Sequence, residues 1–214
     1  MLNVAQQRTK APTAEQLRPD LLRIANWIPA GSRVLDLGCG DGSLLHYLCE
    51  NDQTRGWGIE LSDPKLVNCL NRGVNAIQAD LDDPQVLAQF DDNQFDVVVM
   101  SLALQAVNRP QEMLAELLRI GKQGIVTFPN FGHWRCRWQI ANGQMPVTSS
   151  LPDRWYNTDN IHLCTVRDFE RLCGEENILI EERATMDRHH KSSWHARTWP
   201  NLFGEIAQYR LQAG

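Results

Sequence analysis

The stretch RVLDLGCGDGSLL, residues Arg33–Leu45, decides the fold class. It begins with a short apolar run typical of a buried strand, continues with a glycine at every second position, and ends in an apolar run. A strand, a glycine-rich turn and a helix in this order begin an α/β unit that binds its ligand at the carboxyl end of the strand. The glycines permit positive φ and a close approach of the backbone to a ligand.

Strands and helices are predicted to alternate along the rest of the chain. An amphipathic helix over residues 13–28 precedes the glycine turn. Strands are expected over residues 33–37, 54–61, 75–80, 95–102, 123–130, 177–186 and 204–212. Further helices are expected over residues 42–51, 63–73, 84–90, 110–121 and 165–174. This alternation predicts an α/β fold with a doubly wound, mostly parallel sheet.

The alternation stops at residues 131–163, which are long, aromatic and irregular, and residues 187–203 are predicted to form a loop. We therefore expect a flexible tail over residues 1–13 and a single domain over residues 14–214. That domain would carry an aromatic-rich lid or insertion at about residues 130–163.

Charge and sequence patterns disfavour several classes of protein. The net charge of −5 disfavours a nucleic-acid partner and an anionic membrane surface. No apolar run approaches the length of a membrane span, and the first residues lack a signal-peptide core. The cysteines have no C-x-x-C spacing, and His189, His190 and His195 lack ligand spacing on a defined element, so no metal site is predicted. We expect a cytoplasmic protein with reduced thiols.

The glycine turn has the wrong spacing and charge for a dinucleotide. Its glycines are Gly38, Gly40 and Gly42, which gives G-x-G-x-G rather than G-x-G-x-x-G, and Ser43 stands where the third glycine would be. Asp36 and Asp41 flank the turn, and a carboxylate is electrostatically unfavourable beside a phosphate. A ligand with an ammonium and a sulfonium group suits them better, so we predict S-adenosylmethionine (SAM) or S-adenosylhomocysteine (SAH).

Acidic residues also end the next two predicted strands. Glu60 lies about 20 residues beyond the turn, where a carboxylate accepts hydrogen bonds from ribose hydroxyls. Asp80 ends the third strand, where it suits the adenine amino group, with Leu81 against the ring. The predicted cofactor-binding residues are Asp36, Gly38, Cys39, Gly40, Glu60, Leu61, Asp80, Leu81 and Ser101.

Several motifs resemble known families. VLDLGCGDG, GIEL, QADL and FDVVVMS resemble the motifs of class I SAM-dependent methyltransferases, over about residues 30–130. This resemblance implies a sheet of seven strands with the last one antiparallel. The longer runs LRPDLLRIANWIPAGSRVLDLGCGDGSLL, LQAVNRP, IVTFPNFGHWRCR and WYNTDNIHLCTVRDFERLC resemble the methionine biosynthesis protein MetW family, over about residues 17–186. The sequence departs from that family at Asp159, where proline is commoner, and in SLALQA, a variant of SQTLQA.

The resemblance to MetW implies a function with a partner. MetW-like proteins act with MetX, a homoserine O-acyltransferase of the α/β-hydrolase fold. The implied function is therefore that of a partner subunit, in which the acyl-transfer nucleophile belongs to MetX.

Machinery for a methyl acceptor is not evident in the sequence. No N-P-P-Y-like run follows residues 95–102, and Ala106 stands where many small-molecule methyltransferases have histidine. His133 and His162 are weak catalytic candidates, and for His162 a packing role is at least as well supported. Thr165 is predicted to cap the next helix together with Asp168.

The aromatic segment has two readings. Trp134 and Trp138 alternate with arginines such as Arg135, which is the composition of protein–protein hot spots, so these three residues are a tentative interface. An ordinary lid core over the cofactor is equally compatible with this composition.

Three functions follow from these readings. The first is a non-catalytic SAM-binding partner of MetX, and the second is an autonomous small-molecule methyltransferase. The third, an NAD-dependent oxidoreductase, is disfavoured by Asp41 and Ser43.

Overall fold

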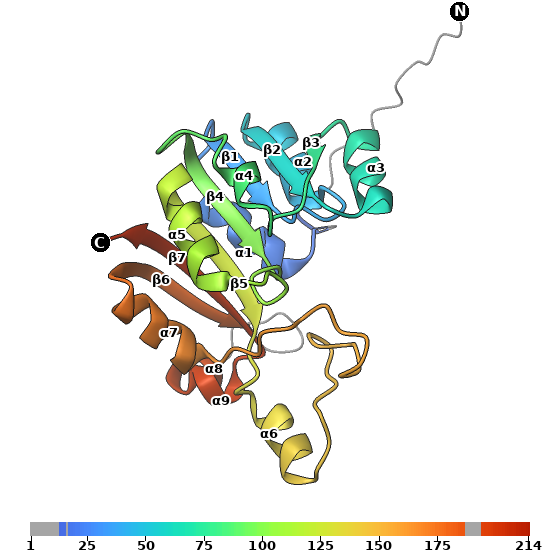
Figure 1. Cartoon of the computed structure of the whole chain (residues 1–214), viewed down its shortest axis with the longest axis vertical. Helices are drawn as coiled ribbons and strands as arrows, with labels where there is room; N and C mark the ends of the chain where they lie inside the picture. The colour runs from blue at the N-terminus through green and yellow to red at the C-terminus, as the bar shows by residue number, and fades with distance from the viewer. Residues whose placement is uncertain (1–12, 16, 187–193) are drawn as a thin grey trace, which may run out of the picture.

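The computed structural model of the chain describes residues 13–15, 17–186 and 194–214 (Figure 1). The predicted tail over residues 1–13 lies almost wholly outside the described residues, and so do His189 and His190.

Seven strands of the described chain form one sheet, in the order β3-β2-β1-β4-β5-β7-β6. They are β1 (Arg33–Leu37), β2 (Arg55–Glu60), β3 (Asn75–Gln78), β4 (Phe95–Ser101), β5 (Gly121–Pro129), β6 (Ile178–Met186) and β7 (Ile206–Ala213). The β7 strand runs antiparallel to both of its neighbours, and the first five strands pair in parallel. The predicted doubly wound, mostly parallel sheet with an antiparallel last strand is confirmed.

The helices cover both faces of this sheet. They are α1 (Pro19–Trp27), α2 (Ser43–Asn51), α3 (Asp63–Asn71), α4 (Pro84–Leu87), α5 (Pro110–Ile120), α6 (Trp134–Ala141), α7 (Val166–Glu175), α8 (Trp194–Thr198) and α9 (Pro200–Phe203). Figure 1 shows α5 in front of the sheet and α1 behind it.

Some helix boundaries differ from the prediction. The first helix begins at Pro19 and not at residue 13, because a proline ring fits the first turn of a helix but not its interior. The aromatic segment, predicted to be irregular, contains α6, and the predicted loop over 187–203 contains α8 and α9. These helices are short and lack an aliphatic face at helical spacing, so periodicity did not reveal them.

The core has two parts, one on each face of the sheet. Alternate residues of a strand point to opposite faces, so Leu35 of β1 and Val98 of β4 join the cluster with α5 and α7. Their neighbours Val34 and Val97 join the cluster with α1 and α2. Both faces of the central strands are therefore buried, as expected for a parallel sheet.

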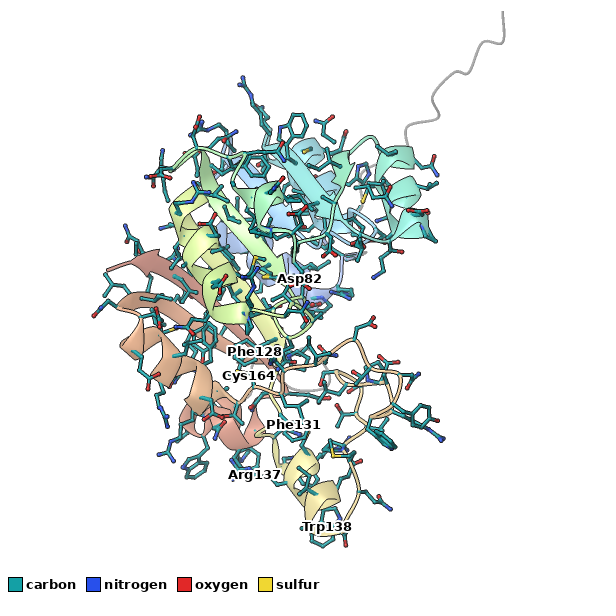
Figure 2. The ribbon with its side chains drawn as sticks, viewed as in Figure 1. Asp82, Phe128, Phe131, Arg137, Trp138 and Cys164 are labelled. Atoms are coloured by element: carbon teal, nitrogen blue, oxygen red, sulfur yellow. The ribbon has the colours of Figure 1, made fainter. Side chains whose placement is uncertain are left out.

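Residues 131–164, here called the arm, leave the sheet after β5 and return before α7. The Phe131 N–H donates to the Cys164 carbonyl (2.9 Å), which closes the base of the arm. Beside it the fully buried Asn130 accepts from the N–H groups of Gly132 (2.9 Å) and Val166 (3.2 Å). Figure 2 shows Phe131 and Cys164 near the sheet and Trp138 far from it.

Candidate functional site: a cleft at the carboxyl ends of the strands

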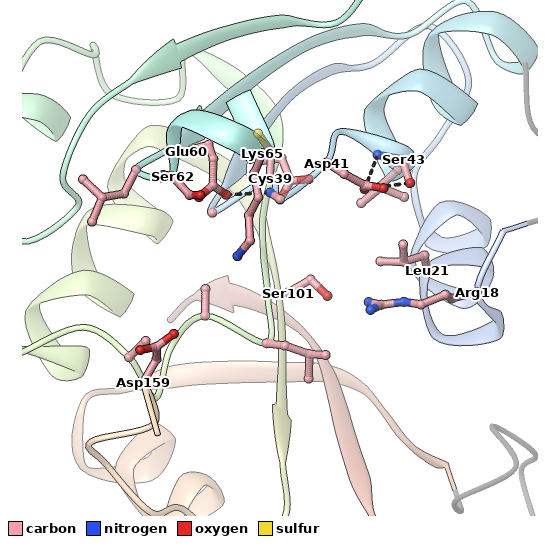
Figure 3. A pocket seen from close by; sticks show the side chains of 18 of the residues that line it. Arg18, Leu21, Cys39, Asp41, Ser43, Glu60, Ser62, Lys65, Ser101 and Asp159 are labelled. Atoms are coloured by element: carbon pink, nitrogen blue, oxygen red, sulfur yellow. Dashed lines mark hydrogen bonds between the residues drawn. The ribbon is translucent and has the colours of Figure 1, made fainter. Parts of the chain in front are cut away.

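A cleft of about 1370 Å³ opens at the carboxyl ends of β1, β2 and β4. The glycine turn between β1 and α2 forms one wall, and residues of the arm form part of the opposite wall (Figure 3). Six of the nine predicted cofactor-binding residues come from strand ends or the glycine turn: Asp36, Gly38, Cys39, Gly40, Glu60 and Ser101. With Leu61 they line the cleft.

Asp36 contributes a buried carboxyl group to the lining of the cleft. It is only 3% exposed, and its Oδ1 has no hydrogen-bond partner in the described part of the chain. Burial, assisted by the charge of Glu60, raises the pKa of Asp36 to about 7. A buried carboxyl group that faces a cleft without a partner is suited to a cationic group of a ligand.

The backbone of the glycine turn lines the cleft at residues with positive φ. Gly38 has φ +76°, and a Cβ there would lie 3.0 Å from the Cβ of Ala103. Gly40 has φ +60°, and a Cβ there would meet no atom within 4 Å, so that side of the turn is open. A side chain at Gly40 would therefore suffer backbone strain and also occupy open space beside the cleft.

Glu60 supports the turn in addition to lining the cleft. One carboxylate oxygen accepts from the Gly40 N–H (2.8 Å) and the other from the Ser62 N–H (2.9 Å). The sequence indicated a ribose contact and did not indicate this bridge between β2 and the glycine turn.

Asp41 occupies the position at the start of α2 that a phosphate takes in dinucleotide-binding proteins. Its Oδ1 accepts from the N–H (3.1 Å) and the hydroxyl (2.7 Å) of Ser43, and its Oδ2 pairs with Arg72 (2.9 Å). Despite the cost of burial, the hydrogen bonds from Ser43 and the charge of Arg72 lower the pKa of Asp41. The start of α2 is thus already supplied with a carboxylate, which disfavours a phosphate there.

The cleft also includes residues that the sequence did not suggest. Arg18 and Leu21 reach it from the α1 region, Lys65 from α3, and His46 from α2. His46 is 5% exposed, and its Nε2 has no partner among the described residues. Figure 3 shows the side chains of Arg18 and Lys65 directed into the cleft.

The far wall of the cleft consists largely of small and polar side chains. Ala103 and Ala106, from the loop after β4, contribute small groups. The arm contributes Asp153, Thr158, Asp159, Asn160 and Ile161. In Figure 3, Asp159 lies across the cleft from Asp41 and Ser43.

Four of the predicted site residues lie outside the lining of the cleft. The exposed Asp80 accepts from the Asp82 N–H (2.9 Å), and Leu81 packs against the core beside α5. His133 is buried at the start of α6, where burial lowers its pKa. His162 is exposed, and its Nε2 lies 3.2 Å from the Asn108 carbonyl oxygen. Their assigned roles stay predictions.

The tentative interface residues lie on α6. Trp134 is 45% exposed and Trp138 67% exposed, and the Arg135 guanidinium lies 5.5 Å from the centroid of the Trp134 ring. The predicted cap of α7 is present, because the Thr165 hydroxyl oxygen accepts from the Asp168 N–H (3.2 Å).

The described residues show neither a metal-ligand cluster nor a membrane-spanning helix. Over residues 13–15, 17–186 and 194–214, no group of three or more His, Cys, Asp or Glu side chains is placed to hold a metal ion. Over the same residues, no helix has the length and apolar character needed to cross a membrane.

Solved structures with the same fold include SAM-dependent methyltransferases. One from Mesorhizobium loti has a TM-score of 0.64 and 19% identity, and the match covers 93% of this chain and 97% of that one. Another from Archaeoglobus fulgidus has a TM-score of 0.64 and 17% identity, with 93% and 94% covered. At this identity the likeness shows the fold alone.

Sequence comparison is more specific. A protein of Rhodopirellula baltica, the bifunctional methionine biosynthesis protein MetXA/MetW, is 34% identical over 206 residues, which are 92% of this chain and 33% of that protein. The chain thus spans about a third of the length of this relative. The model of the family described as methionine biosynthesis protein MetW matches residues 18–211. This match covers nearly the whole described chain, and the chain therefore belongs to the MetW family of methionine biosynthesis proteins.

Proposed function

We propose that this chain is a SAM- or SAH-binding subunit that acts in methionine biosynthesis together with a MetX-type homoserine O-acyltransferase. The observation that carries the proposal is the relationship to the bifunctional MetXA/MetW protein, whose name joins the two functions in one polypeptide. The match covers a third of that relative.

The chemistry of the cleft supports a ligand of the SAM type. The orphaned Oδ1 of Asp36 suits the ligand ammonium, and Glu60 suits the ribose hydroxyls. The open side of Gly40 leaves room for close approach of the ligand. When bound, SAM supplies an activated methyl group, whereas SAH has the same shape without it.

The far wall supports a binding role over methyl transfer. Methyl transfer needs a positioned acceptor and often a general base. No histidine, cysteine, tyrosine or lysine is among the described residues of this wall, and its two carboxylates, on Asp153 and Asp159, are exposed. We therefore assign no catalytic residue.

The partner would bind on the arm. Trp134 and Trp138 are exposed on α6, and Arg135 stacks on Trp134, as is common in hot spots. Replacement of both tryptophans by alanine should weaken the complex, with each truncation costing roughly 2–4 kcal/mol and the two costs not strictly additive.

The test is a homoserine acylation assay with the MetX-type acyltransferase of the same organism. The acyltransferase mixed with this chain should be far more active than the acyltransferase alone, and the chain alone should be inactive. The Trp134→Ala/Trp138→Ala variant should need a higher concentration to give the same activity, while its SAH affinity is retained. Full activity of the acyltransferase without this chain would refute the proposal.

A second measurement addresses the autonomous methyltransferase. The chain alone is incubated with methyl-labelled SAM and a metabolite extract. Transfer of label at roughly 1 per second or faster, an ordinary rate for an enzyme, would replace the partner function by methyl transfer.

A further inference from the structure

One segment of the arm belongs both to the cleft and to an exposed aromatic surface. This segment, residues 152–161, is here called the strap. Asp153 lines the cleft at one end of the strap, and Thr158 to Ile161 line it at the other. The residues between them, 154–157, do not line the cleft. The strap is therefore an outward loop with both of its ends in the cleft wall.

Trp155 and Tyr156 form the crest of this loop. Trp155 is 72% exposed and Tyr156 is 63% exposed. Their rings meet edge to face at 5.6 Å, and Arg154 donates to the Tyr156 hydroxyl (3.3 Å). A tryptophan, a tyrosine and an arginine together on the surface have the composition of a binding hot spot.

The hydrogen bonds of the strap are local. Within the part of the chain that is described, the hydrogen bonds of residues 152–161 all join residues of the strap to one another. Among the described residues, hydrogen bonds to other elements lie just beyond its two ends. On one side the Ser149 hydroxyl donates to the buried Glu205 (2.6 Å), and on the other the His162 N–H donates to the Gln105 carbonyl (3.0 Å).

We propose that a nucleoside ligand in the cleft orders the strap and thereby strengthens binding of the acyltransferase to Trp155 and Tyr156. This inference rests on the proposed function, and it states how the ligand would regulate binding of the partner. A partner that binds the crest must otherwise order the strap itself, which costs affinity. If the ligand has already ordered the strap, the partner meets a smaller cost, and the two bind with positive coupling. Coupling is reciprocal, so the partner must also tighten ligand binding by the same factor.

The first test needs no partner. Trypsin cleaves after arginine, and the exposed Arg154 directly precedes the crest. SAH at saturation should slow cleavage after Arg154 at least fivefold. Cleavage after Arg171, which is exposed in the middle of α7, reports opening of the whole fold. Protection of Arg154 alone supports ordering of the strap, whereas no protection, or equal protection of Arg154 and Arg171, overturns it.

The second test measures the affinity of the complex with and without SAH. SAH should tighten the complex of the wild-type chain about fivefold or more, the lower end of typical coupling between sites. Trp155→Ala/Tyr156→Ala should weaken the complex and remove most of this response. The matched control is Trp57→Ala, because Trp57 is an exposed tryptophan (49%) on β2 that lies outside the cleft lining, and this variant should behave as the wild type.

The outcomes separate this inference from the proposed function. A complex that forms with an affinity indifferent to SAH, or weakened by it, overturns the coupling and leaves the partner function intact. If no complex forms with or without SAH, the proposed function and the coupling both fail.

Discussion

Replacement of Asp36 by asparagine should stabilise the free protein and weaken its ligand binding. Asparagine keeps the size of the side chain and removes the charge. In the free protein Asp36 is a buried carboxyl whose pKa is raised to about 7, chiefly by burial and secondarily by Glu60. The negative charge that would attract a cationic ligand therefore destabilises the folded protein when no ligand is bound.

The stability effect has a definite sign and pH range. The unfolded chain loses the Asp36 proton near pH 3.8, whereas the folded chain holds it up to about pH 7. Between these values the folded state binds more protons, so the free energy of unfolding falls as the pH rises, and it stays low above pH 7. A pKa difference of this size corresponds to roughly 4 kcal/mol at pH 8, as an order of magnitude.

Urea unfolding of the wild type and Asp36→Asn at pH 5 and pH 8 measures this effect. The variant should be more stable than the wild type at pH 8 by a few kcal/mol, with a smaller difference at pH 5. A matched control is Asp96→Asn, because hydrogen bonds from Lys122 and Arg33 lower the pKa of Asp96. That control should lose stability at pH 8.

Ligand affinity should move in the opposite direction. A charged hydrogen bond is worth about 1.5–3 kcal/mol, so Asp36→Asn should bind SAH about tenfold to a hundredfold more weakly. In the wild type the ligand ammonium favours the ionised carboxyl, so affinity should rise from pH 6 to pH 8, and in the variant this dependence should be absent. Calorimetric titration that finds equal affinity and the same pH dependence in both proteins would refute this role of Asp36. A variant less stable than the wild type at pH 8 would refute the assignment of the charge as unfavourable.

Substitutions at three further positions test the turn, its support and the base of the arm. Gly40→Val should abolish measurable SAH binding by calorimetry, whereas Gly31→Val, which has a similar positive φ (+76°) and open surroundings outside the cleft, should cost stability and keep binding. Glu60→Gln should weaken SAH binding about tenfold to a hundredfold. Glu60→Ala should also lower the melting temperature, because this variant leaves the N–H groups of Gly40 and Ser62 without their acceptor. Unchanged SAH affinity in both variants would make Glu60 purely structural. Asn130→Ala should cost about 3 kcal/mol or more in urea unfolding, since several buried backbone groups lose a partner, whereas Asn142→Ala, at the exposed C-cap of α6, should stay within about 0.5 kcal/mol of the wild type.

The sequence by itself determined the sheet and the wall of the cleft that the sheet provides. The alternation of apolar strands with helices follows from backbone periodicity, which is local. In a parallel sheet the carboxyl ends of the strands meet at one edge, so Asp36 and Glu60 could be placed together from their positions at strand ends. The same rule did not bring Asp80 into the lining, because β3 ends at Gln78 and the Asp80 side chain turns back to bond its own loop.

Only the tertiary structure decided the rest of the cleft. His46 of α2 and Leu21 of α1 line the cleft because of how these two helices pack on the sheet. The spacing of residues along the sequence does not predict such contacts. The family motif around Asn130 was recognisable as a pattern, but its role depends on partners such as Gly204, 74 residues away. The spacing of residue types along the sequence predicts local structure such as helices, turns and caps. Contacts between distant segments depend on how whole elements pack, and that is why the strap's position over the cleft appears only in the folded chain.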